Sequence, residues 1–547
     1  MNELCDAARL PLGMTGFSDL RNSGNIYVDK TAMIYEFARL HTPLFLSRPR
    51  RFGKSLLVDT LECLFSRGVE DFHGLAIEKL WKDKTYSVVR LDFSGIADLK
   101  PQKFVSKCGN LVLKRFNAQG KVPSLDDKGE YLDPSEILDD ILDRLENNST
   151  VLLIDEYDAP LVHHLNAPDE LQDIMRILNN FYAVIKEYTK KFRFIFITGV
   201  TRTAHVSIFS AFNNLEDLSL KKEYNTLLGF TQDELRQCFD PYAENAAHVL
   251  GMSKEALYAR LEHYYDGFQF AIEAEETLYN PWSVLNFLKY PDDGFKNYWY
   301  ESGGVSSLVV NYLKRSDTFD FMNYDDRKIT TTPRKLSERY EITAIPREIL
   351  LYQAGYFTIR LEEDGRLCLL PPNGEVEESL LDLYLFSNNL DPQIQLSSVI
   401  NTTASKIDNH DIPGIVDVFN EILKYVISPV SNTFLHECSV RDVIFSSFLQ
   451  NRKLQVFKEC VSLKGFSDLE MLTNKTHMVI EFKRTYPKDE EKGCFRDEKA
   501  SLKEAIEQMK SHHYGEDPFS TRTLFRVAMV ISTEKKRILP EYCKEVE

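Results

Sequence analysis

Two short stretches of this chain contain residue types that could together bind a triphosphate. Residues 48–55 read Arg-Pro-Arg-Arg-Phe-Gly-Lys-Ser, and residues 151–156 read Val-Leu-Leu-Ile-Asp-Glu. The first stretch ends in the Gly-Lys-Ser of a phosphate-binding loop, and the second is an apolar run that ends in two acids, as a buried strand would. Either pattern alone is weak. Their occurrence in this order predicts a nucleoside triphosphate site.

Each polar residue of these stretches has its own task in such a site. Gly53 belongs to a loop whose backbone N–H groups point at phosphate oxygens, Lys54 contacts the β- and γ-phosphates, and the Ser55 hydroxyl reaches a metal ion. Asp155 holds the water shell of that metal, and Glu156 polarises the attacking water. The expected cofactors are therefore ATP and Mg²⁺, with Ser55 and Asp155 as the metal-binding residues.

The arginines of the loop depart from the usual pattern. Arg48 stands where such a loop normally begins with glycine, and Pro49 removes one backbone donor. Arg50, Arg51 and Arg48 could compensate by their charge, or they could bind a different anion. The plainer alternative is a basic strand-to-helix turn without a ligand, which the acidic strand downstream disfavours.

A third strand is expected at residues 192–197, followed by Thr198 and, four residues later, Arg202. Residues at the carboxyl ends of strands in a doubly wound sheet face the ligand crevice. Thr198 is therefore expected to sense the γ-phosphate, and Arg202 either supplies charge to it or pairs with a surface acid or caps a helix. Asp158, in the loop after the acidic pair, is interpreted as structural.

A second chemical centre is expected near the C-terminus. If residues 465–472 and 477–483 form an antiparallel hairpin, Asp468 lies directly opposite Glu481, and Lys483 shares their face. Two opposed carboxylates repel, so this arrangement favours a divalent cation between them, Mg²⁺ or Mn²⁺. Asp468, Glu481 and Lys483 then form the core of a phosphodiesterase site, and the alternative is a solvated polar face. The apolar residues of the hairpin should occupy its other face: Leu469, Met471, Met478, Ile480 and Phe482.

These sites require a chain of α/β type. Strands are expected at residues 25–28, 44–46, 87–93, 151–156 and 192–197, with helices between them, so the first part should be a parallel sheet covered by helices. Beyond residue 230 the pattern becomes helical. We therefore expect a P-loop domain at 1–229, a helical lid or connector at 230–370, and a second α/β domain at 371–547.

Composition limits the function classes. A chain of 547 residues suggests three or four domains, and its net charge of −17 confines any polyanion site to a local basic cleft. Nine cysteines without a CxxC pair indicate reduced thiols. No signal peptide and no apolar run of membrane-spanning length are present, so the expected location is cytoplasmic, with no membrane partner.

The first part of the chain resembles the AAA-ATPase-like family of bacterial proteins. The Arg48 start of the phosphate loop is how that family is usually written. The stretches that carry the resemblance are 27–31, 47–55, 155–161, 198–202, 209–215, 265–268 and 279–283.

The last part resembles the PD-(D/E)XK nuclease superfamily, a domain of restriction-endonuclease-like α/β fold. The matching residues are Gly465, Asp468, Glu481, Lys483, and a helix with Ala505, Gln508 and Tyr514. The acid expected on the first helix of that domain is either Glu437 or Asp442. Glu459 is either an auxiliary acid or an ordinary surface residue.

The resemblance implies an ATP-binding, ATP-hydrolysing module coupled to a metal-dependent nuclease that acts on nucleic acid, with DNA favoured, in defence against foreign DNA. A homo-oligomer is a further expectation. One alternative is a nucleotide-driven switch whose nuclease-like domain only binds nucleic acid or a protein partner, and another is a constitutive nuclease with a structural nucleotide. A basic run is interpreted either as a backbone-tracking groove or as a solvated helix face: Lys475, Lys483, Arg484, Lys488, Lys492, Arg496, Lys499 and Lys503.

Overall fold

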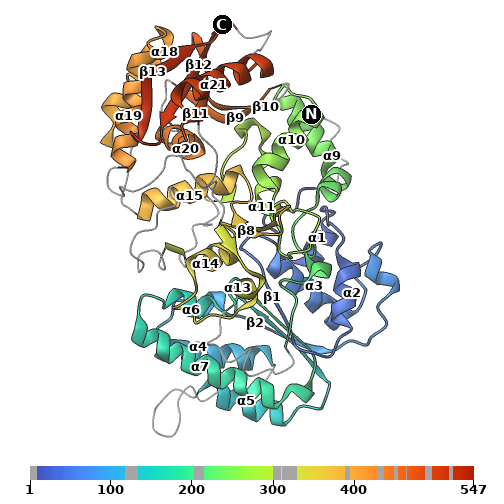
Figure 1. The fold of residues 1–547 in the computed structure, drawn as a ribbon. Coiled ribbons are helices and arrows are strands. Elements are labelled where there is room, and N and C mark those ends of the chain that lie inside the picture. Colours follow the sequence, from blue (N-terminus) through green and yellow to red (C-terminus); the bar gives the residue numbers. More distant parts are fainter. Residues whose placement is uncertain are drawn as a thin grey trace. The chain divides into compact units, whose positions relative to one another are not determined.

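The computed structural model divides the chain into two compact units (Figure 1). One consists of Met1–Arg315 and Ile329–Glu377, and the other of Ser316–Lys328 and Glu378–Glu547. The P-loop region and the helical region expected after residue 230 thus fall in the same unit. The structure describes residues 9–116, 133–202, 215–299, 309–310, 329–387, 395–427, 437–448, 454–462, 465–486, 496–515 and 521–547.

The first unit is built on a parallel sheet. Its five strands lie in the order β2-β3-β4-β1-β5, and every neighbouring pair is parallel. Strands β1, β3 and β4 are buried along their whole length, as expected when helices cover both faces of a sheet. This confirms the predicted α/β class. The strands are β1 (Leu44–Ser47), β2 (Ser87–Asp92), β3 (Thr150–Asp155), β4 (Phe192–Gly199) and β5 (Glu216–Asp217).

Helices alternate with these strands. The helix after the phosphate loop, α3, packs on β2 and β3, so it fixes the loop against the acidic strand. Helix α5 begins with a capping residue, because the Asp133 side chain accepts the N–H of Ser135 and proline follows at the first helical position. The helices are α1 (Phe17–Asn22), α2 (Thr31–Ala38), α3 (Lys54–Arg67), α4 (Pro101–Arg115), α5 (Pro134–Asp143), α6 (Ala159–His163) and α7 (Pro168–Glu187).

The strand expected at residues 25–28 is wrong. Asn25 makes only an isolated bridge to Arg9, and the Ile26 N–H donates to the Arg9 carbonyl at 2.9 Å. The short apolar segment has the composition of a strand, but no strand of the described residues pairs with it. Its side chains instead line a cavity, as described below.

The helical region of the first unit surrounds a core of its own. Thr231 and Glu234 form a reciprocal capping box at the start of α9, and Ser253 and Asn280 cap the next two helices. A small antiparallel sheet, in the order β6-β8-β7, completes the unit. The elements are α9 (Gln232–Val249), α10 (Lys254–Tyr265), α11 (Pro281–Lys289), β6 (Ile329–Thr331), α13 (Pro333–Ser337), α14 (Arg347–Ala354), β7 (Thr358–Leu361) and β8 (Leu367–Leu370).

The second unit contains a mixed sheet in the order β13-β12-β11-β10-β9. Strands β11 and β12 are parallel and the other pairs are antiparallel. Helix α21 connects the two parallel strands and packs on both, while α20 packs on β9, β10 and β11. The strands are β9 (Gln455–Ser462), β10 (Gly465–Leu472), β11 (Thr476–Arg484), β12 (Thr523–Ser532) and β13 (Arg537–Glu545). The helices are α15 (Gly374–Ser387), whose first residues belong to the first unit, α17 (Ser397–Ile400), α18 (Thr403–Asp408), α19 (Ile412–Ile427), α20 (Glu437–Phe448) and α21 (Glu498–His512).

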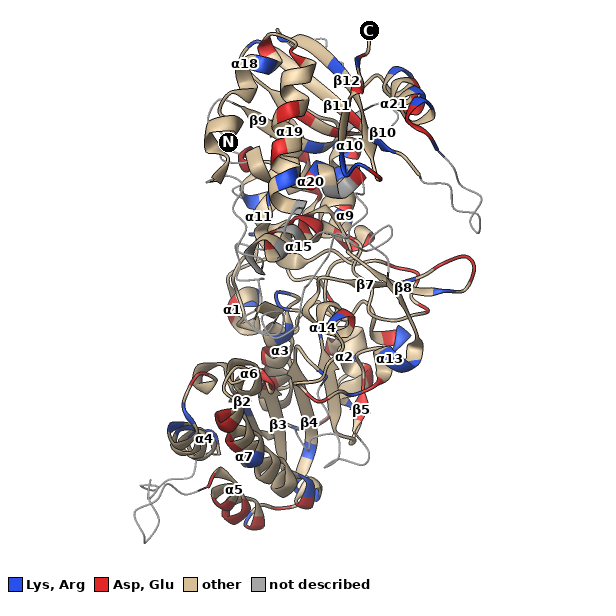
Figure 2. Ribbon diagram, turned by 60° about the vertical axis from the view of Figure 1, so that its left-hand side comes forward, with Lys and Arg blue, Asp and Glu red and all other residues tan. Residues whose placement is uncertain are grey.

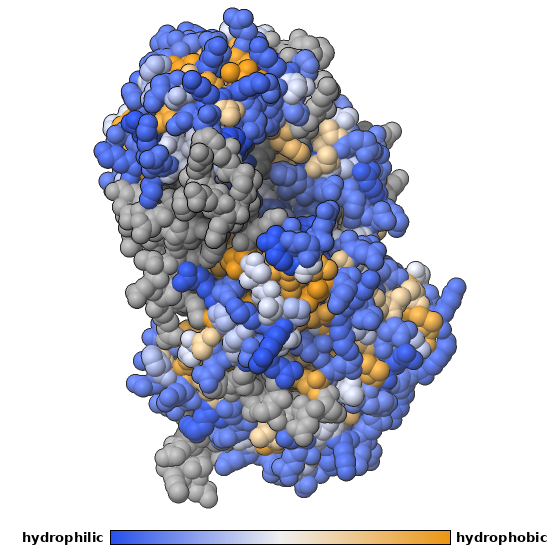
Figure 3. Space-filling view, viewed as in Figure 1, coloured by the Kyte–Doolittle hydropathy of each residue, from blue (hydrophilic) through white to orange (hydrophobic). Residues whose placement is uncertain are grey.

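The face in Figure 3 is mostly hydrophilic, with apolar patches between polar side chains. Among the described residues, no helix has both the length and the apolar composition needed to cross a bilayer.

Candidate nucleotide and metal sites

The phosphate loop joins β1 to α3 as the sequence predicts. Gly53 is the residue before the helix and has a φ of 93°, a left-handed conformation that glycine adopts without strain. The Lys54 ammonium is buried and donates to the carbonyls of Arg48 and Pro49, both at 3.0 Å. Burial lowers the pKa of Lys54, and the nearby carboxylates of Glu156 and Asp155 act in the opposite direction. This lysine is held by main-chain dipoles, and no carboxylate oxygen of the described residues lies within 4.0 Å of its ammonium.

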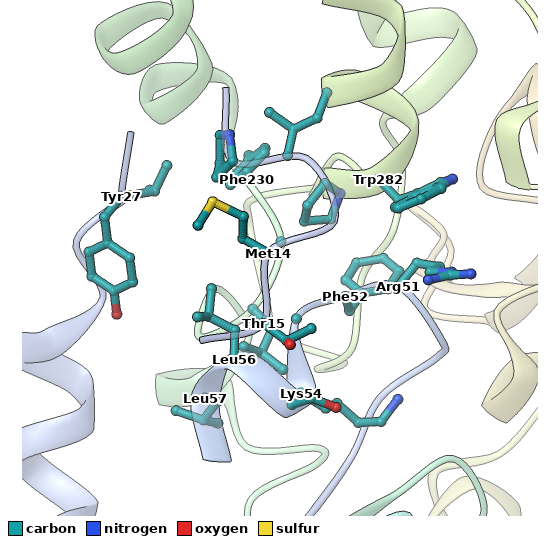
Figure 4. A pocket seen from close by; sticks show the side chains of 18 of the residues that line it. Met14, Thr15, Tyr27, Arg51, Phe52, Lys54, Leu56, Leu57, Phe230 and Trp282 are labelled. Atoms are coloured by element: carbon teal, nitrogen blue, oxygen red, sulfur yellow. The ribbon is translucent and has the colours of Figure 1, made fainter. Parts of the chain in front are cut away.

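A cavity of about 380 Å³ opens beside this loop (Figure 4). The loop and the start of α3 form one side, and residues 11–15, 26–28 and 227–230, the start of α11 and Glu156 contribute to the others. The Arg51 guanidinium lies 4.4 Å from the centre of the Trp282 ring, and Figure 4 shows the two side by side. The lining away from the loop is mainly apolar and aromatic, which suits the base of a nucleotide.

Several cavity residues were not predicted as a ligand site. Residues 11–15 and 26–28 carry no phosphate-binding motif, and the 279–283 stretch, which contains Trp282, was only part of the family resemblance. The available signal was that stretch itself, because a Pro-Trp pair at a helix start places a large ring at a fixed position. The residues that line the cavity together with Trp282 could not be identified from the sequence.

The acidic strand delivers its two carboxylates to the loop. Asp155 is 1% exposed, and its Oδ1 accepts the Glu156 N–H at 3.0 Å. No group of the described residues donates a hydrogen bond to its Oδ2, and Arg90 Nη2 lies 3.8 Å from this oxygen. Burial raises the pKa of Asp155, while the nearby Ser55 hydroxyl and Lys54 lower it. A buried carboxylate oxygen without a donor, next to a hydroxyl, fits the predicted Mg²⁺ ligands.

Glu156 directly follows Asp155, the last residue of β3. It lines the cavity and has a φ of 52°, which is uncommon outside glycine. Burial raises the pKa of its carboxyl group, and Lys54 acts against that shift.

The three arginines of the loop divide into two groups. Arg48 is buried and donates to the carbonyls of Ser47, Ser219 and Tyr224 at 2.8–2.9 Å, and it lies over the Phe270 ring. Its charge is therefore used within the fold. Arg50 and Arg51 line the cavity, so they remain the candidates for phosphate contact.

Thr198 and Arg202 lie outside the cavity lining. The Thr198 hydroxyl donates to the Leu46 carbonyl at 2.8 Å, which ties β4 to β1. The Arg202 guanidinium pairs with Asp217 at 2.7 Å and donates to the Leu336 carbonyl at 2.6 Å. Both side chains thus connect neighbouring segments of the fold. For Arg202, the ion pair with Asp217 agrees with the alternative of an acidic partner that the sequence left open.

Asp158 is structural, as predicted. Its Oδ2 accepts the N–H and the hydroxyl of Thr201, both at 2.6 Å, and the N–H of Val200 at 3.2 Å. Gly199 lies so close that a Cβ there would be 2.4 Å from Asp158 Oδ1 and 2.5 Å from the Tyr157 ring. The end of β4 is thus fixed by a carboxylate and leaves no room for a side chain.

The hairpin in the second unit has the predicted register. Leu469 pairs with Ile480 and Met471 with Met478, so the same ladder places Asp468 opposite Glu481. The residues predicted for the other face are fully buried. The Lys483 ammonium lies 2.6 Å from Glu481 Oε1, and Asp468 Oδ2 accepts the Phe482 N–H at 2.7 Å. The structure therefore brings all three predicted residues together.

The hydrogen bonds at this site do not compensate all of the charge on its carboxylates. Glu481 is 1% exposed, and no group of the described residues donates a hydrogen bond to its Oε2. Burial raises the pKa of both Asp468 and Glu481, and their mutual repulsion adds to the rise at Glu481. Burial disfavours the charged form of Lys483, but Glu481 and Glu437 raise its pKa overall. Two buried carboxylates, one of them with an oxygen that accepts no hydrogen bond from the described residues, fit the ligands of a divalent cation.

Of the two acids considered for the first helix of the nuclease-like domain, Glu437 is the one whose side chain reaches this site. Its Oε1 accepts the Arg484 N–H at 2.6 Å, and its Oε2 lies 3.9 Å from the Lys483 ammonium. Asp442 instead pairs with Arg441 at 3.0 Å and with Lys458 at 3.4 Å. The side chain of Glu459 lies outside the described residues.

Helix α21 packs on β11, the strand that carries Glu481 and Lys483. Ala505 packs in a core cluster with Val479 and Tyr514, and the Tyr514 hydroxyl accepts a hydrogen bond from Gln508 at 2.9 Å. Within the described part of the chain, no three acidic, histidine or cysteine side chains lie close enough to hold a metal by themselves. The Lys483 ammonium lies near both Glu481 and Glu437.

The basic run is only partly described. Lys488 and Lys492 lie outside the described residues. Arg496 pairs with Glu437 at 3.4 Å and also with Glu504, and Lys503 pairs with Glu507 at 3.6 Å. Figure 2 shows basic and acidic residues together on α21. Much of this charge is compensated locally, which favours the solvated helix face for that part of the run.

Comparison with known proteins gives matches in both units. The family model described as "Predicted AAA-ATPase" matches residues 11–209, and that of the PD-(D/E)XK nuclease superfamily matches residues 437–541. A protein of Azotobacter chroococcum mcd 1, described as "Uncharacterized protein in vnfD 5'region", is 29% identical over 494 residues, covering 87% of this chain and 89% of that protein. The parallel sheet with its phosphate loop and the mixed sheet with its carboxylate hairpin agree with these matches. The chain thus carries an AAA-ATPase-like domain followed by a PD-(D/E)XK nuclease superfamily domain.

Proposed function

We propose that this protein is a metal-dependent nuclease whose activity is controlled by ATP binding, and by ATP hydrolysis, in its first unit. The observation that carries the proposal is the convergence of Asp468, Glu481 and Lys483 on one face of β10 and β11. A donor-free oxygen on buried Glu481 supports a cation at that place. The substrate would be nucleic acid, with DNA favoured.

In the nuclease unit, Asp468 and Glu481 would hold Mg²⁺ or Mn²⁺. The bound ion would supply an activated water and stabilise charge on the phosphate. Lys483 stays protonated at neutral pH because its pKa is raised. It is therefore suited to steady negative charge on a phosphate and poorly suited to act as a general base. Glu437 would orient Lys483 through the contact between their side chains.

In the first unit, ATP would occupy the cavity beside the phosphate loop. Lys54 would exchange its two carbonyl acceptors for phosphate oxygens, and Arg50 and Arg51 would add positive charge. Ser55 and Asp155 would hold the metal ion. Glu156 would orient a water, and its raised pKa means that it needs the nearby Lys54 to remain ionised.

The test is a digestion panel of single- and double-stranded DNA and RNA, with Mg²⁺ or Mn²⁺, each with and without ATP. Asp468→Asn and Lys483→Ala should reduce cleavage at least about a hundredfold. Glu541→Gln, an exposed acid on β13 of the same sheet, is the matched control and should cleave like wild type. Equal cleavage by all four proteins would reject the nuclease.

A role in defence against foreign DNA is the biological extension of this proposal, and it rests on analogy with the two-domain architecture. Plaque counts on cells that express wild type or Asp468→Asn test it. Protection should require Asp468, and equal counts with both proteins would remove the defence role without affecting cleavage measured in vitro.

A second function is favoured by the ion pair between Lys483 and Glu481. A lysine that already neutralises a carboxylate could keep the metal out, and the second unit would then only bind nucleic acid or a protein partner under nucleotide control. Calorimetric titration with Mn²⁺ separates the two functions. Binding that Asp468→Asn abolishes supports the nuclease, and the absence of heat from wild type supports the switch. Cleavage that is independent of ATP would instead indicate a constitutive nuclease.

A further inference from the structure

Two exposed phenylalanines lie on the same face of the second sheet as the carboxylates. Phe466 precedes Asp468 by two residues on β10, and side chains two residues apart share a face. Phe457 on β9 pairs with Glu470, which lies two residues beyond Asp468. Directly paired residues also share a face, so Phe457, Phe466 and Asp468 are on one side of the sheet.

The exposure of these rings is unusual for this sheet. Phe457 is 42% exposed and Phe466 39%, whereas the apolar side chains on the opposite face of β10 and β11 are fully buried. Strand β9 is at the edge of the sheet. Helix α21 packs on β11, β12 and β13, so it covers the other end of this face.

We propose that Phe457 and Phe466 are stacking platforms for unpaired bases, and that the nuclease site therefore takes single-stranded nucleic acid. This inference rests on the proposed function, because it requires a phosphate at Asp468 and Glu481. Stacking on aromatic rings is tolerant of sequence, since every base has a π-face. A site of this kind needs no base-reading motif, and the chain contains none that the sequence reveals.

The spacing of the two rings selects against a duplex. Phe466 and Phe457 lie in rows of the sheet four residues apart, with the row of Asp468 between them. Four residues of strand correspond to roughly 13 Å. Neighbouring bases in one strand of a duplex are about 3.4 Å apart. Bases on either side of a phosphate held at Asp468 could therefore stack on both rings only if the strand were unstacked and unpaired.

The charges around the rings add a second requirement. Asp468 lies on the same face between the rows of the two rings, and its carboxylate repels a phosphate backbone, whereas Glu470, in the row of Phe457, pairs with His477 at 2.8 Å. Nucleic acid should consequently bind this face well only when a divalent cation is present. An apolar protein segment docked on the same rings would not need the cation, so cation dependence distinguishes the two kinds of partner.

The experiment is fluorescence anisotropy of the full-length protein with a labelled oligonucleotide of mixed sequence, single-stranded or annealed to its complement. Ca²⁺ replaces Mg²⁺, and a gel confirms that the strands stay intact. Phe457→Ala and Phe466→Ala should each weaken single-strand binding by about five- to a hundredfold. Phe457→Tyr, which keeps a ring, should bind like wild type. The control is Leu361→Ala, because Leu361 is 50% exposed but lies on β7 of the first unit.

The outcomes are separable from those of the proposed function. Tighter binding of single strands than of duplex, lost with either alanine and without Ca²⁺, supports the inference. Duplex preference, or single-strand binding unchanged in both alanine variants whose melting temperatures match wild type, overturns it. If the stacking inference is overturned, cleavage that still depends on Asp468 would leave the proposed nuclease function intact. Cleavage that no longer depends on Asp468 would overturn the nuclease function itself.

Discussion

The two candidate sites each contain a buried lysine, and the two lysines have opposite electrostatic surroundings. Lys54 donates to two neutral carbonyls, and burial lowers its pKa. Lys483 contacts the Glu481 carboxylate at 2.6 Å, and the acids around it raise its pKa. The same residue type therefore serves two different ligands. In the first site the Lys54 ammonium forms no ion pair with a described residue, whereas in the second site the carboxylates of Glu481, Glu437 and Asp468 surround Lys483.

This difference indicates what each site lacks. Around Lys54, a triphosphate would supply the missing negative charge, and the main-chain carbonyls only hold the ammonium until then. Around Glu481, a divalent cation would supply positive charge to an oxygen that has no donor. The comparison thus predicts an anion site in one unit and a cation site in the other, and it can be tested from either side.

The largest expected effect is at Lys54. Lys54→Ala should weaken ATP binding by about 4 kcal/mol, nearly a thousandfold in Kd, because a desolvated cation on the phosphates is lost. Isothermal titration with ATP measures it. The matched control is Lys191→Ala, since Lys191 also donates to two main-chain carbonyls, those of Asp143 and Leu145, but does not line the cavity. ATP affinity that survives in Lys54→Ala would refute the phosphate-loop assignment.

The two acids of α20 should separate stability from metal binding. Asp442→Asn breaks a buried network with Arg441 and Lys458 and should lower the free energy of unfolding by about 3 kcal/mol, with little change in Mn²⁺ affinity. Glu437→Gln should do the reverse and reduce Mn²⁺ affinity about tenfold. Denaturant unfolding and calorimetry measure both quantities. If Asp442→Asn proved to be the variant with the metal defect, the choice of Glu437 would be wrong.

A pH effect should follow from Glu481. Because its pKa is raised in the folded state, folded protein retains a proton that the unfolded chain releases, so stability falls as pH rises above about 4.5. Relative to Glu481→Gln, metal-free wild type should lose about 1–2 kcal/mol between pH 6 and 8. Adding Mg²⁺ should restore the stability of the wild-type protein and should have no such effect on Glu481→Gln. Melting curves that run parallel for the two proteins, with and without Mg²⁺, would contradict this cation site.

The smallest effect concerns Thr198. Because its hydroxyl donates to the Leu46 carbonyl, Thr198→Val should cost about 1 kcal/mol of stability and leave ATP affinity within about twofold of wild type. Thermal unfolding and titration with ATP measure the two effects. A large loss of ATP affinity without loss of stability would instead support the γ-phosphate sensor that the sequence predicts.

The hairpin site could be predicted from the sequence because its geometry is local. A four-residue turn and a period of two fix which side chains of residues 465–483 share a face, and the observed register agrees. The order of strand, loop and helix around Lys54 was predictable for the same reason.

Other features depend on contacts between distant segments. Arg48 is bound by carbonyls of Ser219 and Tyr224, some 170 residues away, which no local pattern indicates. The cavity is completed by residues 11–15 and by Trp282, and residues 26–28 line it instead of forming a strand. Hydrophobic periodicity does not distinguish an apolar segment that pairs in a sheet from one that covers a ligand cavity.

The crowding at Gly199 has a consequence for how this protein can vary. A methyl group there would overlap both the Asp158 carboxylate and the Tyr157 ring, whereas a methyl group at Gly95 would meet nothing within 4 Å. In a saturation library selected for folded protein, position 199 should admit no replacement and position 95 should admit many. The pattern of tolerated residues would then map the rigid end of β4 without any ligand being added.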